Sequence, residues 1–318
     1  MSIADVGEFG LIARIIERLT SNAATLLGPG DDAAVVAVPD GRVVVTTDLL
    51  VDGRHFRRDW STPYDVGRKA AAQNMADIAA MGAVPVALVV GLATPPDIPA
   101  FWAERLADGL REEAARTGAA VVGGDVVRSD TVVVAVTALG DLQGRTPVTR
   151  GGARPGDVVA VIGRLGWAEA GLAALRRGFR TPRAAVEAHR RPEPPYEAGP
   201  IAADRGATSM IDVSDGLLGD LGHVAVASRI RIDVESAALP VADVVAEVAA
   251  ACGVDPLRWV LTGGEDHALA ATFPDRAAVP DGWVVIGRAH EPAGETGDVV
   301  VDGRRYPGSG FSHFAADA

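Results

Sequence analysis

Strand-like and helix-like segments alternate along this chain of 318 residues. In the first half, apolar runs at 41–48 and 84–93 are rich in β-branched residues and predict strands, and alanine-rich runs at 65–82 and 98–118 predict helices that end at glycine. Such alternation is typical of an α/β protein or of a closely interleaved α+β protein. Two more strand-like runs, which we expect to form a strand pair, lie at 119–127 and 131–141.

A stretch rich in glycine, proline and charge at 149–157 interrupts this periodicity. Because chain breakers replace the pattern there, we expect a domain boundary near residue 150. The length is sufficient for two domains with a core each. We therefore expect an N-terminal domain of residues 1–150 and a C-terminal domain of residues 151–318.

The second half continues the alternation. Segment 209–228 predicts a strand, a turn and a helix, whereas the proline-rich segment 180–200 predicts a loop or an irregular lead-in to a helix. Segment 259–273 has β character on both sides of a glycine turn. A further strand is expected at 157–163, and helices at 166–178 and 238–253.

Composition limits the classes of partner. The net charge of −12 repels nucleic-acid backbones and anionic membranes, so we expect neither as a partner. No uncharged apolar run approaches the roughly 20 residues of a membrane span, so the cytoplasm is the expected location. The single cysteine, Cys252, excludes an internal disulfide and a cysteine-based zinc site, and its apolar neighbours predict burial. Lys69 is the only lysine and no GxxxxGK[ST] loop exists, which excludes the common phosphate-binding loop.

Acidic residues stand beside glycines and at the ends of predicted strands. Taken singly, each is more often a turn former or a helix cap. Asp77 and Asp125 fit that explanation less well, because apolar residues surround them and an unpaired buried carboxylate is costly. In chain order the motifs are GDDAA, TTD, NMAD, GGD, DVSDG and GGED, and their acidic residues are Asp31, Asp32, Asp48, Asp77, Asp125, Asp212, Asp215, Glu265 and Asp266.

A divalent cation would neutralise these carboxylates. Magnesium takes one or two carboxylates together with phosphate oxygens and water, so dispersed aspartates suit several Mg²⁺ ions. Zinc would require closely spaced histidines or cysteines, and the six histidines are scattered. The neighbouring glycines would let the backbone approach a phosphate. The sequence therefore predicts a magnesium-dependent phosphate site, in which Asp31 and Asp220 are equally explained as turn or helix residues.

Six longer motifs carry a family resemblance over nearly the whole chain. GPGDDAAVV, TTDLLVDGRHF, NMADIAAMGA, TRGGARPGD, DVSDGLLGDLGH and LTGGEDHAL, in this order, resemble the thiamine-monophosphate kinases, which share a superfamily with aminoimidazole-ribonucleotide synthetase. The resemblance implies ATP-dependent phosphorylation of thiamine monophosphate to thiamine diphosphate. It also implies a two-domain, synthetase-like α/β fold in a homodimer. N-terminal strands of both subunits would form a barrel, and a layered C-terminal α/β domain would complete the active site.

The resemblance further implies roles for individual residues. The implied metal ligands are Asp32, Thr46, Thr47, Asp48, Asp77, Asp125, Asp212 and Asp215. The implied ATP contacts are Gly124, Asp125, Arg150 and Ser214, and the implied thiamine-phosphate contacts are His55, Glu265 and Phe311. Phe311 is equally explained as a core residue near the C-terminus. No residue is expected to act as a covalent nucleophile.

Both reactants in such a transfer are phosphates, which repel each other. Several Mg²⁺ ions between them would reduce the repulsion, and Arg150 would add a cationic fork. The acceptor phosphate is largely ionised near neutral pH, so we expect direct in-line transfer without a general base or a phosphoenzyme.

Two alternatives remain open. The chain could be another ATP-using enzyme of the superfamily, similar to aminoimidazole-ribonucleotide synthetase, although TTDLLVDGRHF and LTGGEDHAL favour the thiamine enzyme. It could also be a nucleotide- or metal-binding regulator without catalysis, against which the intact aspartate positions argue.

Overall fold

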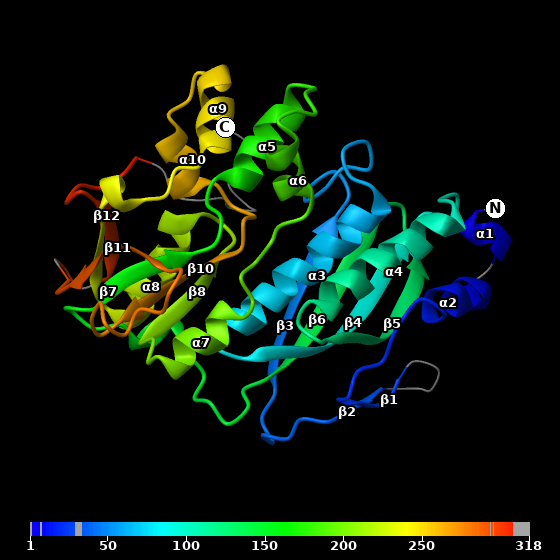
Figure 1. Ribbon diagram of the computed structural model, residues 1–318. Coiled ribbons are helices and arrows are strands. Elements are labelled where there is room, and N and C mark those ends of the chain that lie inside the picture. The colour runs from blue at the N-terminus through cyan, green and yellow to red at the C-terminus, as the bar shows by residue number, and fades with distance from the viewer. Residues whose placement is uncertain (1, 7, 29–33, 293, 295, 308–318) are drawn as a thin grey trace. The chain divides into compact units, whose positions relative to one another are not determined.

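The computed structural model describes residues 2–6, 8–28, 34–292, 294 and 296–307. Contacts between residues divide the chain into two compact units. The first unit comprises Met1–Ile78 and Ala83–Gly144, and the second comprises Ala79–Gly82 and Arg145–Ala318 (Figure 1).

The first unit is built on an open four-stranded sheet in the order β3-β6-β4-β5. Its strands are β3 (Val44–Val51), β4 (Val84–Thr94), β5 (Ala120–Arg128) and β6 (Val133–Asp141). β6 pairs antiparallel with both β3 and β4, and β5 pairs parallel with β4. The expected pairing of segments 119–127 and 131–141 is therefore wrong, because β6 lies inside the sheet and β5 forms an edge.

Burial and glycine content explain this order. Val134, Val136 and Ala138 on β6 are fully buried, as residues of a central strand are. β5 contains Gly123 and Gly124, and glycine weakens the interior of a strand, so β5 suits an edge. A Cβ atom at Gly124 would lie 2.2 Å from the carbonyl oxygen of Val90, so the close pairing of β5 with β4 requires glycine there.

Two long helices, α3 (Pro63–Ala80) and α4 (Ala100–Ala115), cover one face of this sheet (Figure 1). They pack backbone to backbone through Gly67 and Gly109. A Cβ atom at Gly67 would lie 2.2 Å from the carbonyl oxygen of Leu106, and one at Gly109 would lie 2.2 Å from that of Tyr64. The unit also contains α1 (Ile3–Val6), α2 (Glu8–Ile16) and a small hairpin of β1 (Thr25–Leu27) and β2 (Val35–Val36).

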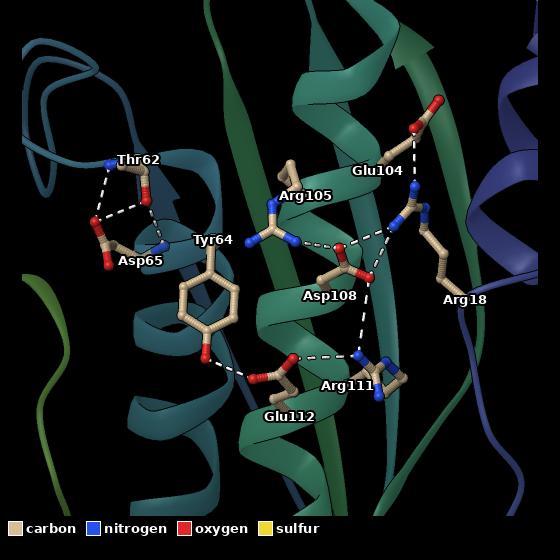
Figure 2. Close-up of polar contacts among 9 residues, drawn as sticks. All are labelled: Arg18, Thr62, Tyr64, Asp65, Glu104, Arg105, Asp108, Arg111 and Glu112. Atoms are coloured by element: carbon tan, nitrogen blue, oxygen red, sulfur yellow. Dashed lines mark hydrogen bonds and ion pairs between the residues drawn. The ribbon is translucent and has the colours of Figure 1, made fainter.

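Figure 2 shows the polar contacts that join α2, α3 and α4. Asp108 on α4 is buried, and its carboxylate accepts hydrogen bonds from Arg18 at 2.9 Å and from Arg105 at 2.7 Å. Arg18, which follows α2, also donates to Glu104 at 3.0 Å. Because α2 and α4 are distant in sequence, this cluster links two separate segments of the first unit.

The second unit contains a six-stranded sheet in the order β12-β9-β11-β7-β10-β8. Neighbouring strands are antiparallel except for the parallel pair β12 and β9. The strands are β7 (Val158–Ile162), β8 (Ser209–Val213), β9 (Arg231–Val234), β10 (Ala268–Phe273), β11 (Val284–His290) and β12 (Asp298–Val301).

Alternate residues of the central strands enter two different cores. Val159 and Val161 of β7 pack in a cluster with Leu217 and other residues of α8, whereas Val158 of β7 packs in another with Met210. Because both faces of the sheet are covered, β8 and β10 are buried along their whole length. The second unit is therefore a layered α/β structure.

The helices of the second unit correct two expectations. Segment 180–200, expected to be a loop or an irregular lead-in, contains α6 and the start of α7. Pro182 precedes α6 and Pro192 follows it, so these prolines lie outside the helix and do not interrupt it. Segment 259–262 ends a helix, α10, which Asp255 caps through the backbone N–H of Leu257 at 3.0 Å. The helices are α5 (Trp167–Arg176), α6 (Arg183–Arg190), α7 (Ala198–Asp204), α8 (Leu217–Ser228), α9 (Asp243–Cys252) and α10 (Pro256–Thr262), with 3₁₀ turns η1 (Arg150–Gly152) and η2 (Ser236–Ala238).

The structure bears on two expectations from composition, which concern membrane-spanning segments and the burial of Cys252. Within the described part of the chain, no helix has the length and apolarity needed to cross a membrane. Cys252 at the end of α9 is half-buried rather than fully buried, and it packs against an apolar cluster that includes Val248.

Candidate active site

Three of the expected metal ligands lie together where β3 faces α3. Thr46 and Asp48 are two residues apart on β3, so their side chains point to the same side of the sheet. The Thr46 hydroxyl donates a hydrogen bond of 2.7 Å to the carboxylate of Asp77 on α3. The backbone N–H of Asp48 donates at 2.9 Å to Asn74, nearly one turn before Asp77. All three expected ligands are half-buried.

Thr47 and Asp125 lie on the opposite face of the same sheet. Thr47 donates to the carbonyl oxygen of Val136 at 3.0 Å. Asp125 on β5 pairs with Gly91 on β4, and Gly91 pairs with Ala135 on β6. Paired residues point to the same face of a sheet, so Asp125 lies on the same face as Ala135, the face opposite α3. Asp125 is exposed, so the expectation of a buried carboxylate at this position is wrong, and burial supplies no argument for a cation there.

His55 and Gly124 each have a structural explanation in the first unit. The His55 ring accepts a hydrogen bond at Nδ1 from the backbone N–H of Val51, at 3.0 Å, which closes the turn after β3. Its neutral ring therefore carries the proton on Nε2. Lys69, buried on α3, donates to the carbonyl oxygen of His55 at 3.2 Å. Gly124 permits the close approach of β5 to β4.

The second unit gathers three aspartates around the loop between β8 and α8. Asp212 near the end of β8 is 4% exposed, and Asp220 in the first turn of α8 is 3% exposed. The Asp220 carboxylate accepts hydrogen bonds of 3.1 Å from the backbone N–H groups of Asp215 and Gly216. Burial, followed by the neighbouring negative charge of Asp212, raises the pKa of Asp220 to about 7. The two backbone hydrogen bonds to Asp220 therefore do not offset the burial of its carboxylate and the repulsion from Asp212.

Segment 263–267, the GGEDH sequence, lies against this loop. The backbone N–H of Glu265 donates to the carbonyl oxygen of Ser214 at 2.8 Å. The Nδ1 atom of His267 lies 3.0 Å from Oδ2 of Asp212, and both residues are buried. The carboxylate of Glu265 is about one-third exposed and lies 3.5 Å from Nδ1 of His189. Ser214 and Glu265 are thus brought together with Asp212.

The remaining expected site residues are less informative. Arg150 in η1 is exposed, and its carbonyl oxygen accepts a hydrogen bond of 2.7 Å from Ser228 at the end of α8. Asp31, Asp32 and Phe311 lie outside the described residues.

Sequence reasoning counted Asp266 among the acidic motif residues but gave it no individual role, and it gave His267 none. A signal was present, because both stand beside Glu265 in the GGEDH sequence. Asp220 was equally explained as a helix residue. The apolar sequence around it, LLGDLG, did not by itself distinguish a buried carboxylate from an exposed one.

The donors in these groups fit magnesium. Carboxylate and hydroxyl oxygens are hard ligands of the kind that Mg²⁺ prefers. Within the described residues, no three side chains of His, Cys, Asp or Glu gather closely enough to hold a metal ion by themselves. Because Mg²⁺ usually keeps waters and takes phosphate oxygens in addition to one or two carboxylates, this arrangement suits an ion that arrives with a phosphate.

The chain is similar in sequence to one family of known proteins. Residues 30–142 match the family described as AIR synthase related protein, N-terminal domain. The thiamine-monophosphate kinase of Mycobacterium tuberculosis (strain H37Rv) is 51% identical over 315 residues, which cover 98% of this chain and 93% of the relative. The Escherichia coli K12 enzyme of the same name is 37% identical over 312 residues, with coverages of 93% and 91%.

A solved structure, AaThiL complexed with AMPPCP and TMP, superposes with a TM-score of 0.81 at 32% identity and covers 99% of both chains. A curated relative with half of its residues identical over nearly the full length identifies the family. The chain belongs to the thiamine-monophosphate kinase family.

Proposed function

We propose that this enzyme transfers the γ-phosphoryl group of ATP to the phosphate of thiamine monophosphate and releases thiamine diphosphate and ADP. The observation that carries the proposal is the full-length match to thiamine-monophosphate kinases at up to 51% identity. The related structure with AMPPCP and TMP supports ATP as the co-substrate and thiamine monophosphate as the acceptor. An ATP-consuming reaction also suits the cytoplasm as the proposed location.

Magnesium ions would be held in both units. Thr46, Asp48 and Asp77 are the proposed ligands in the first unit, and Asp212 and Asp215 in the second. When bound, Mg²⁺ would supply positive charge that offsets the repulsion between donor and acceptor phosphates. Asp32, Thr47 and Asp125 complete the proposed ligand set by family resemblance.

The protein groups around these ligands would hold them in fixed orientations. The Thr46 hydroxyl orients the carboxylate of Asp77 by a hydrogen bond. Asp220 binds the backbone N–H groups of Asp215 and Gly216 and so fixes the loop that carries Asp215. Second-layer hydrogen bonds of this kind set the direction in which a ligand points.

Substrate contacts are proposed in two sets. Gly124, Asp125, Arg150 and Ser214 would contact ATP, and His55, Glu265 and Phe311 would contact thiamine monophosphate. Thiamine carries a permanently positive thiazolium ring, which the carboxylate of Glu265 complements in charge. We propose that both units contribute to this one reaction.

Transfer would be direct and in line. The acceptor phosphate has a second pKa of about 6, so it is largely a dianion at neutral pH and needs no general base. A single-turnover experiment with γ-labelled ATP and no acceptor tests this step. We expect no label on the protein, and a labelled protein would contradict direct transfer.

A homodimer is proposed from the uncovered face of the first-unit sheet. Val45, Leu49, Val89 and Val127 are between 37% and 55% exposed on the face opposite α3. Exposed apolar patches of this kind usually mark an interface. A second copy placed on this face would let two open sheets close into a barrel. Sedimentation of the wild type should give a dimer, and Leu49→Lys should shift it toward a monomer, whereas Leu26→Lys, on β1, should not.

The function as a whole is tested by a coupled ADP-release assay over a panel of phosphate acceptors. Thiamine monophosphate should give the highest kcat/KM. Faster turnover with a ribonucleotide acceptor would favour a different superfamily enzyme, and ATP binding without turnover on any acceptor would favour a regulator.

A further inference from the structure

Asp266 is a buried carboxylate for which the proposed reaction has no role. It is 4% exposed, and its Oδ1 atom accepts a hydrogen bond of 2.8 Å from the backbone N–H of Ala168. The other carboxylate oxygen, Oδ2, is buried without a hydrogen-bond partner among the described residues. Ala168 is the second residue of α5, so Asp266 caps the start of a helix that lies about 100 residues earlier in the chain.

The residues on both sides of Asp266 adopt a backbone conformation that is unusual for them. Glu265 has φ of 66° and His267 has φ of 53°, in the left-handed region that side chains other than glycine disfavour. Such strain persists only where surrounding contacts determine it, and it clusters at functional sites. Asp266 therefore anchors a strained segment to α5.

The backbone of this segment also contacts the end of β8 and the loop that follows it. The Glu265 N–H donates to Ser214, and the His267 N–H donates to the carbonyl oxygen of Val213 at 3.0 Å. A Cβ atom at Gly264 would lie 2.3 Å from the carbonyl oxygen of Ser214, so the two backbones touch. The conformation of segment 265–267 and that of the loop are consequently coupled.

The His267 ring transmits this coupling to a proposed metal ligand. Its Nδ1 atom lies 3.0 Å from Oδ2 of Asp212. An ionised carboxylate only accepts hydrogen bonds, so His267 donates from Nδ1. This hydrogen bond holds Oδ2 and so fixes the rotation of the Asp212 carboxylate. The direction in which the carboxylate can bind a metal ion is therefore set by His267.

We propose that His267 is a positioning residue that orients Asp212 for Mg²⁺ binding, and that Asp266 anchors the segment that carries it. The inference rests on the proposed function, in which Asp212 is a magnesium ligand. Groups that orient metal ligands typically change metal affinity or activity by about 10- to 100-fold when they are removed.

A matched pair of variants tests the role of His267. His267→Leu removes the donor, and His267→Asn keeps an N–H donor near the position of Nδ1. In His267→Leu, the Mg²⁺ concentration for half-maximal rate should rise about tenfold, and in His267→Asn it should rise less than about threefold. The same order should appear in the rise of Tm that Mg²⁺ with AMPPCP produces, a readout that needs no turnover.

A control separates positioning from a loss of folding. Asp266→Ala should lower Tm and raise the Mg²⁺ requirement. Asp255→Ala also removes the cap of a second-unit helix, α10, through its bond to Leu257, and it should lower Tm without changing the Mg²⁺ requirement. An unchanged Mg²⁺ requirement in His267→Leu, or an equal rise in His267→Asn, would overturn the proposal.

Failure of the proposed function would look different. The wild type itself would then lack Mg²⁺-dependent transfer to thiamine monophosphate, or Asp212→Asn would bind Mg²⁺ with AMPPCP as the wild type does. If instead the wild type is active and Asp212→Asn loses Mg²⁺ binding, the comparison of the two His267 variants decides the positioning role alone.

Discussion

The acidic residues of the two units occupy different surroundings. In the first unit Asp48 and Asp77 are half-buried, and Asp125 is exposed. In the second unit Asp212 and Asp220 are almost fully buried and close enough for the charge of one to raise the pKa of the other. The first unit thus holds its carboxylates in partial contact with water, and the second holds them in a repulsive pair.

The proposed metal ligands of the two units should therefore differ in their effect on the stability of the metal-free protein. Two buried carboxylates repel each other strongly, because burial weakens solvent screening. The pair therefore destabilises the metal-free protein, and a bound cation removes that destabilisation. A half-buried carboxylate such as Asp77, which accepts a hydrogen bond from Thr46, carries less of that cost. We therefore expect removal of charge to have opposite effects on the metal-free stability of the two units.

The largest expected effect is on activity. Asp77→Asn and Asp212→Asn should each lower kcat/KM for thiamine monophosphate by about a hundredfold or more, since each removes a proposed magnesium ligand. At pH 8 without metal, Asp212→Asn should raise Tm because it relieves the repulsion with Asp220. Asp77→Asn should not raise Tm.

Steady-state kinetics and thermal melts in EDTA measure both quantities. A near-normal rate and Mg²⁺ dependence in Asp77→Asn would contradict the ligand assignment in the first unit. A rise in metal-free Tm in both variants would remove the contrast between the units.

The second expected effect is a pH dependence of the second unit. Burial raises the pKa of Asp220 from an ordinary value of 3.8 to about 7, so the folded protein prefers the protonated form. The stability that this preference provides is complete below pH 3.8 and is lost as the pH rises through about 7. Asp220→Asn, which mimics the protonated form, should not show that loss.

Urea unfolding in EDTA between pH 4 and 8 measures this dependence. Relative to Asp220→Asn, the wild type should lose free energy of unfolding with a slope of up to about 1.4 kcal/mol per pH unit. Asp125→Asn, a change at an exposed carboxylate, should follow the wild type. Parallel curves for wild type and Asp220→Asn would show that Asp220 is not perturbed.

The contrast between the units also marks what sequence could predict. Segment 209–228 was predicted as strand, turn and helix, and β8 and α8 confirm it, because local periodicity carries that information. The order of β5 and β6 was predicted wrongly, since strand order depends on contacts between distant segments. The expected identities of the phosphate acceptor and of the nucleotide came from the family resemblance and not from the residue pattern.

Burial of single carboxylates was also beyond sequence reasoning. Asp125 has apolar neighbours along the chain, yet its position on the edge strand β5 exposes it. Asp220 follows a helix start and resembles an ordinary first-turn acid, yet packing of α8 buries it. In both cases the deciding factor is which element lies opposite in space, and that is not encoded in adjacent residues.

The smallest expected effect concerns stability of the first unit alone. Asp108 on α4 binds Arg18, which follows α2, and Arg105 on α4 itself, and the side chains of these arginines are one-third to one-half exposed (Figure 2). Because water screens these partners, Asp108→Ala should lower the free energy of unfolding by about 1–2 kcal/mol, less than a fully buried ion pair would. Glu112→Ala, which removes an exposed contact with Tyr64, should change it by less than about 0.5 kcal/mol.

Urea unfolding measures both changes, and kcat per folded molecule should stay at the wild-type value, because neither residue contacts the proposed ligands. The pH profile adds a further distinction from the second unit. Asp108 has oppositely charged neighbours, so Asp108→Ala should leave the decline in stability between pH 4 and 8 in place. Loss of that decline in Asp108→Ala would mean that the buried carboxylates of the second unit are not its source.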